Sequence, residues 1–95
     1  MDAQKMTKIF KALSNQNRLE LYLKIVETSE ASYSNYNECL ISDIIHSLNI
    51  GAPTISHHIK ELANAGLITT EKKGKFLICK ANHELAEDVS KLFKL

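Results

Sequence analysis

The side chains best suited to bond another molecule lie in one short segment, between Gly51 and Gly66. On a helix, at about 100° per residue, Ile55, Ile59 and Leu62 share one side of this segment. The opposite arc carries hydroxyls, an imidazole and a lysine, and it has no large apolar group. Such groups can bond to phosphates and base edges, and the major groove of DNA admits a helix. The residues that we expect to contact DNA on this arc are Pro53, Thr54, Ser56, His57 and Lys60.

The two adjacent histidines of this segment have different expected roles. His57 lies on the polar arc, whereas His58 lies about 60° from Ile55, at the margin of the apolar side. We interpret His58 as a half-buried, hydrogen-bonded residue, with base reading as the alternative. Neighbouring residues on a helix point about 100° apart, so the two histidines cannot bind one metal ion from a single face.

Positive charges gather within this segment and directly after it. Between Ala52 and Lys80 there are five lysines and two acidic residues, although the whole chain has a net charge of only +1. Two runs of strand-favouring residues, 67–71 and 76–80, flank a turn that contains Gly74. The pattern predicts a two-stranded hairpin with a basic tip, or wing, that reaches DNA phosphates. The expected contacts of the wing are Lys72, Lys73 and Lys75.

Amphipathic helices are expected to precede these two surfaces. Apolar residues at i, i+3, i+4 and i+7 predict a first helix at residues 3–13. A second helix follows Asn15, whose side chain can cap it. This helix is apolar over most of its circumference, which is typical of a central helix. We expect Leu19, Leu23 and Val26 to pack into the core.

The remaining boundaries are marked by polar stretches and by capping residues. Residues 28–38 are polar and without a period, so they predict a loop, either ordered or mobile. An apolar stripe returns at residues 40–48 and predicts a third helix. Gly51 can begin the next helix and Gly66 can end it, while Asn82 can cap a last helix.

Helix, short turn, helix and hairpin together predict a mainly α fold of the winged helix-turn-helix class. We expect about five helices and a two-stranded wing in a single domain that spans residues 1–95. No catalytic constellation and no ligand cluster is visible, so neither enzymatic activity nor a cofactor is expected. Cys39 and Cys79 are interpreted as buried thiols, with a redox or metal role as the alternative. The chain has no membrane-length apolar run and no secretory segment, which places it in the cytoplasm.

The chain resembles the ArsR/SmtB-type winged-helix repressors. The resemblance covers nearly the whole sequence and is most specific between Ser56 and Leu67. The residues that carry it are Phe10 to Ser14, Arg18-Leu19, Ser42 to Ile44, Pro53 to Ile59, Leu62 and Ala65 to Leu67, with Lys73 to Lys75 in the wing. The resemblance implies a homodimer, built from the first and last helices, that binds an operator in double-stranded DNA. It also implies that an effector releases the DNA.

The apolar stripes of the terminal helices support such a dimer. One small core cannot cover both stripes, and exposed apolar patches usually mark an interface. The residues expected at the dimer interface are Met6, Ile9, Phe10, Leu13, Leu85, Val89, Leu92 and Phe93. A two-fold dimer would bind a pseudopalindromic site.

The effector chemistry of the metal-sensing members does not carry over. Those members place a Cys-x-Cys just before the Asp of the helix that precedes the turn. Here Leu40 to Ser42 stand before Asp43, and Cys39 lies outside that frame. Other members place paired histidine and acidic ligands along the last helix, where this chain has a single histidine, His83, at the very start. We therefore expect no metal site. The alternative function is a winged-helix module that binds protein, which would need an exposed apolar patch on the recognition face.

Overall fold

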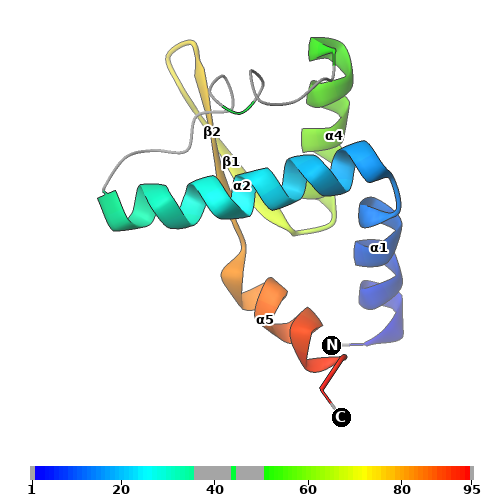
Figure 1. Ribbon diagram of the computed structural model, residues 1–95. Helices are drawn as coiled ribbons and strands as arrows, with labels where there is room; N and C mark the ends of the chain where they lie inside the picture. The colour runs from blue at the N-terminus through cyan, green and yellow to red at the C-terminus, as the bar shows by residue number, and fades with distance from the viewer. Residues whose placement is uncertain (1, 36–43, 45–50, 95) are drawn as a thin grey trace.

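Helices dominate the chain, and one hairpin is the only sheet among the residues that the structure describes. The computed structural model describes residues 2–35, 44 and 51–94. In chain order the elements are helix α1 (Ala3–Leu13), helix α2 (Gln16–Asn35), helix α4 (Ala52–Asn64), strands β1 (Ile68–Lys73) and β2 (Phe76–Ala81), and helix α5 (His83–Lys91). In Figure 1, α2 crosses the middle of the molecule, with the hairpin tip and the start of α4 above it and α1 and α5 below it. The expected mainly α architecture is confirmed.

The helix expected at residues 40–48 lies outside the described residues, except for Ile44. That residue is helical, and its side chain is buried.

Side-chain caps start three of the helices. The Asp2 carboxylate accepts a hydrogen bond from the backbone N–H of Lys5 at 2.7 Å, before α1. The amide oxygen of Asn15 accepts one from the N–H of Arg18 at 3.0 Å, which confirms the expected cap of α2. Asn82 accepts one from the N–H of Leu85 at 3.1 Å. Each cap satisfies a backbone donor that the first turn of a helix leaves without a partner.

Helix α2 extends further than the sequence pattern predicts. The polar composition of residues 28–38 predicts a loop, and for residues 28–35 this prediction is wrong, because α2 continues to Asn35. Residues 36–38 lie outside the described residues. Ser, Thr, Asn and Tyr each disfavour a helix by less than about 0.7 kcal/mol relative to Ala, and the chain has no Gly or Pro before Gly51. Extending a helix that is already nucleated therefore meets little resistance.

The core lies where α2 packs against β2, α4 and α1. The α2 side chains in it are Leu21, Tyr22 and Ile25. The prediction that Leu19 and Leu23 are core residues is wrong, since their exposed fractions are 37% and 55%. A helix that is apolar on most sides offers two possible core arcs, and the position of β2 and α4 selects one of them. Val26 is partly buried against the core, as expected.

The hairpin pairs β1 and β2 in antiparallel register, from Ile68 opposite Ala81 to Lys73 opposite Phe76. The two-residue loop between the strands begins with Gly74, whose φ of 60° lies in the left-handed region that favours glycine. Every β1 residue after Ile68 is exposed, whereas Ile78, Cys79 and Ala81 of β2 are buried. The hairpin therefore packs on the core through β2, and its tip is exposed.

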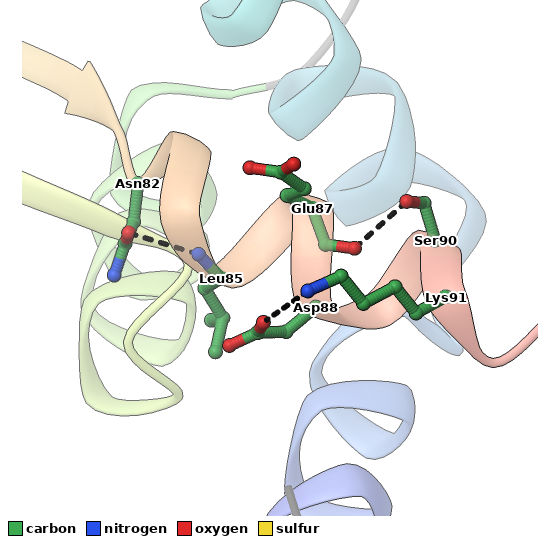
Figure 2. A network of polar contacts seen from close by, with 6 residues as sticks. All are labelled: Asn82, Leu85, Glu87, Asp88, Ser90 and Lys91. Atoms are coloured by element: carbon green, nitrogen blue, oxygen red, sulfur yellow. Dashed lines mark hydrogen bonds and ion pairs between the residues drawn. The ribbon is translucent and has the colours of Figure 1, made fainter.

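Helix α5 turns a polar face to solvent (Figure 2). Lys91 and Asp88 form an ion pair at 3.9 Å, and the Ser90 hydroxyl donates to the Glu87 carbonyl at 2.7 Å. Asn82 also donates to the Gly66 carbonyl at 3.0 Å, which ties the start of α5 to the end of α4. None of the helices in the described part of the chain has the length and apolar content that a membrane span requires.

Candidate nucleic-acid interface

Local backbone chemistry fixes both ends of α4. At its start Gly51 is the N-cap, with Pro53 in the first turn, where no intrahelical N–H is needed. At its end the N–H of Gly66 bonds to the Ala63 carbonyl and the N–H of Leu67 to the Leu62 carbonyl, each at 3.0 Å. This pair of bonds is a Schellman motif, and Gly66 has the positive φ, 80°, that the motif requires. The predicted bounds of the helix are confirmed.

The division of α4 into an apolar and a polar arc is also confirmed. Ile55, Ile59 and Leu62 are buried, with exposed fractions of 1%, 7% and 0%. All five residues of the predicted contact arc are exposed: Pro53, Thr54, Ser56, His57 and Lys60. Because Gly51 supplies no side-chain cap, it leaves donors at the start of α4 for another acceptor. This is the arrangement that favours an anion at a helix N-terminus.

His58 is buried more deeply than the sequence predicts, at 4% exposed. Its Nδ1 accepts a hydrogen bond from Nε of Arg18 at 3.2 Å. The expected hydrogen bond is thus found for one ring nitrogen, while the buried Nε2 has no partner within the part of the chain described. The His57 ring lies beside it, with centroids 6.1 Å apart. Burial lowers the pKa of His58, and the charges of Arg18 and His57 lower it further.

Arg18 is the residue that reasoning from local pattern missed. It belongs to the first turn of α2, yet its Nη1 donates to the Ala12 carbonyl at the end of α1, at 3.3 Å. Together with the bond to His58, this places one guanidinium against three helices. The available signal is weak: a cationic residue three positions after the capping Asn15, with no acidic residue in the first turn of that helix.

The wing carries its cations in exposed positions. Lys72 and Lys73 end β1 and Lys75 lies in the loop, and all three are exposed. Nζ of Lys75 lies 5.7 Å from the centroid of the Phe76 ring, a cation–π geometry that orders a side chain at the tip. Among the other lysines of this block, Lys60 and Lys80 are also exposed. The local excess of positive charge therefore faces solvent.

The residues expected at a dimer interface fall into three classes of burial. Phe10, Leu92 and Phe93 are exposed by 39%, 52% and 69%. The Phe10 and Phe93 rings meet edge to face, with centroids 6.4 Å apart, so the first helix and the C-terminal segment are adjacent. The half-buried members are Met6, Leu13, Leu85 and Val89. Ile9 is 1% exposed within a single chain, so it supports this surface from beneath.

The two cysteines differ in what is known of their surroundings. Cys79 is buried, with an exposed fraction of 0%, as expected. Cys39 lies outside the described residues. Within residues 2–35, 44 and 51–94, no three His, Cys, Asp or Glu side chains are grouped so that they could hold a metal ion.

Comparisons with known proteins bear on this geometry. A family model described as bacterial regulatory protein, arsR family, matches residues 34–70, which include α4. The chain is 28% identical to the arsenical resistance operon repressor of Staphylococcus xylosus, over 95% of this chain and 78% of that protein. It is 30% identical to the HTH-type transcriptional regulator YuzN of Bacillus subtilis, over 87% of this chain and 88% of that protein. The solved structure of an ArsR-like transcriptional regulator from Rhodococcus has the same fold, with a TM-score of 0.74 at 18% identity, covering 94% of this chain and 76% of that one.

Proposed function

The chain belongs to the ArsR family of DNA-binding transcriptional regulators, and from this we propose how it represses transcription. It binds a pseudopalindromic operator as a homodimer. Helix α4 enters the major groove, and the β1–β2 wing contacts the DNA backbone. The proposed DNA contacts are Pro53, Thr54, Ser56, His57 and Lys60 on α4, and Lys72, Lys73 and Lys75 on the wing.

One observation supports this proposal above the others: a polar helix face and a basic hairpin tip are both exposed, at the two ends of one short segment. The side chains on α4 can bond to base edges, and the wing lysines can neutralise phosphates. The alternative, a module that binds protein, would need large apolar groups on the exposed arc of α4. The contact arc has none.

Assembly as a homodimer is supported by the apolar side chains that one chain leaves exposed. Phe10, Leu92 and Phe93 are large, and they lie on the first helix and on the C-terminal segment. Leu19 and Leu23 add further exposed apolar area on α2. Two-fold pairing through such surfaces sets two copies of α4 about 34 Å apart, one turn of DNA. In this assignment residues 1–95 act as one domain, without a catalytic role, in the cytoplasm, where the operator is.

A selection experiment tests the proposal and needs no known operator sequence. Purified protein is incubated with a pool of randomised duplexes, and the retained DNA is amplified and sequenced. We expect enriched sequences with two-fold symmetry and half-sites about one helical turn apart. The double variant His57→Ala/Lys60→Ala should enrich no such sequence, whereas the exposed α5 variant Lys91→Ala should enrich the same one. Retention of no duplex at low salt would favour the protein-binding alternative.

A further inference from the structure

Three helices meet at one side chain, Arg18. Its backbone lies in the first turn of α2, where Asn15 caps its N–H. Nη1 donates to the Ala12 carbonyl, one of the acceptors that the end of α1 leaves without a helical partner. A cation at this end of a helix is favoured by the helix dipole. Nε donates to Nδ1 of His58, which lies forty residues further along the chain, on α4.

This contact is the only hydrogen bond between side chains of α4 and α2 that the described residues show. The other contacts of α4 with the core are made by apolar side chains such as Ile55 and Leu62. Apolar contacts have little directional preference, whereas a hydrogen bond fixes distance and angle. The Arg18–His58 bond therefore restrains how α4 is rotated against α1 and α2.

Resting on the function proposed above, we propose that Arg18 is a positioning residue for DNA recognition, which acts through neutral His58 to fix the orientation of α4. The neighbour of His58 on the helix, His57, is one of the proposed base-reading residues and is exposed. A small rotation of α4 displaces that whole face relative to the base edges. Sites that recognise a partner through side chains tolerate displacements of only about 0.5 Å.

The bond has a chemical condition, because Nδ1 of His58 accepts a hydrogen bond from arginine, which is always protonated. Nδ1 must therefore carry a lone pair, and the ring proton resides on the buried Nε2. A second proton on the ring would place an Nδ1–H opposite the Nε–H of Arg18, and a positive imidazolium beside the positive guanidinium. Burial already lowers the pKa of His58, followed by the charges of Arg18 and His57.

Other charged groups line a cavity beside Arg18. Lys8 and Lys11 of α1 and Glu61 of α4 line a cavity of about 190 Å³ together with Arg18. Glu61 is the only acid among the described residues that line this cavity. The charges that act on His58 are those of Arg18 and His57, and both lower its pKa. The electrostatic environment favours the neutral imidazole that the bond requires.

A double-mutant design separates positioning from mere stability. Arg18→Met removes the donors of His58 Nδ1 and of the Ala12 carbonyl, and His58→Leu leaves the half-buried Nε of Arg18 without its acceptor, so each single variant destabilises the fold. The double variant Arg18→Met/His58→Leu removes both partners, so its urea unfolding midpoint should recover toward that of the parent protein. DNA recognition should not recover. The readout is the ratio of the affinity for the selected duplex to the affinity for a scrambled duplex, measured on folded protein. Loss of a positive charge weakens both affinities alike, so it cancels in this ratio.

We expect the ratio to fall about ten- to a hundredfold in both single variants and in the double variant, the loss of one or two base contacts. Lys24→Met, which removes a half-exposed cation from the same helix, should leave the ratio unchanged. If the ratio recovers together with stability in the double variant, Arg18 has only a structural role and the proposal fails. If the parent protein selects no duplex at all, the proposed function fails, and the positioning role with it.

The pH dependence gives a second readout that a merely structural contact would not move. Ring ¹⁵N spectra of the free protein should show a His58 Nδ1 without a proton at neutral pH, whatever the DNA result. As the pH falls, the affinity ratio should begin to drop near the midpoint at which His58 itself titrates. His58→Asn keeps an acceptor that cannot be protonated, so its ratio should fall less than that of the parent protein over the same range. Equal pH profiles for the parent and His58→Asn, or a protonated Nδ1 at neutral pH, would overturn the proposal.

Discussion

Replacing Lys73 and Lys75 with alanine tests the wing in a way that its register makes specific. Lys73 stands opposite Phe76 in the hairpin, and Lys72 stands opposite Leu77. Successive residues of a strand point to opposite faces, so Lys73 shares the face of Phe76 and Lys72 lies on the other. Lys75 lies over the Phe76 ring. A single DNA backbone lying along this face would meet Lys73 and Lys75 together.

The expected effect follows from the release of counterions. Each phosphate contact with duplex DNA contributes about 0.9 to the slope of log K against log salt. Loss of two contacts lowers the slope by about 1.8 per protomer and by about 3.6 in a dimer. Between about 50 and about 200 mM salt, this removes about two orders of magnitude from the salt sensitivity of the affinity.

The assay is fluorescence anisotropy of a labelled duplex across a series of salt concentrations. The control variant Lys24→Ala/Lys91→Ala removes the same number of positive charges, two, but from α2 and α5, away from the wing. An unchanged slope in Lys73→Ala/Lys75→Ala, or an equal fall in the control, would remove the wing from the interface. A further fall of about 0.9 per protomer on adding Lys72→Ala would place the tip between two backbones.

Four further predictions concern the reading face, acid stability, assembly and metals. His57→Ala and Lys60→Ala should each weaken binding to the selected duplex by about 1–3 kcal/mol and change the unfolding free energy by only a few tenths; if anisotropy shows parent-like affinity for both, the reading face is misplaced. Because burial lowers the pKa of His58, the unfolded chain takes up its proton at a higher pH than the folded chain, so stability is full above about pH 6.5 and falls as the pH drops toward the folded pKa. The urea midpoint should be lower at about pH 5.5 than at about pH 7.5, and this difference should be smaller in His58→Asn; an equal difference would count against this assignment. Phe93→Asp should shift sedimentation toward the monomer and weaken operator binding, since it places a charge in an apolar contact; a parent protein that sediments as a monomer at micromolar concentration would contradict the dimer. Calorimetric titration of reduced protein with zinc should detect no tight site, and sub-micromolar binding that Cys39→Ser abolishes would reverse this expectation.

Local patterns in the sequence predicted the α4 segment well. The bounds of α4 depend on Gly51 and Gly66, and its polar arc depends on spacing of 100° per residue, both of which are visible within sixteen residues. Neither feature depends on contacts with distant parts of the chain. The hairpin is similar, because strand-favouring runs on either side of Gly74 leave few alternatives.

Most of the features that the sequence did not predict depend on distant contacts. The core arc of α2 is chosen by β2 and α4, and this leaves Leu19 and Leu23 exposed. The bond between Arg18 and His58 joins residues forty positions apart that no periodicity links. The depth of burial of His58 follows from the same packing. Helix α2 continued through a polar stretch because no residue there stops a helix, a property that a search for apolar stripes does not detect.

We expect affinity and specificity to arise from different parts of this domain, and the two sets of variants test this expectation. A chain with a net charge of +1 cannot bind DNA strongly through its overall charge, so we expect local groups of lysines, above all those of the wing, to supply the salt-dependent attraction. In the proposed assignment the α4 face reads bases and Arg18 orients that face, and the two printed bonds of the guanidinium go to His58 and Ala12 rather than to the wing. The wing variant should therefore lower the salt slope while the ratio of selected to scrambled affinity is retained. Arg18→Met/His58→Leu should lower that ratio at an unchanged salt slope. If either variant changed the salt slope and the affinity ratio equally, the orientation of α4 and the backbone contact of the wing would be coupled. The wing would then have to move with α4.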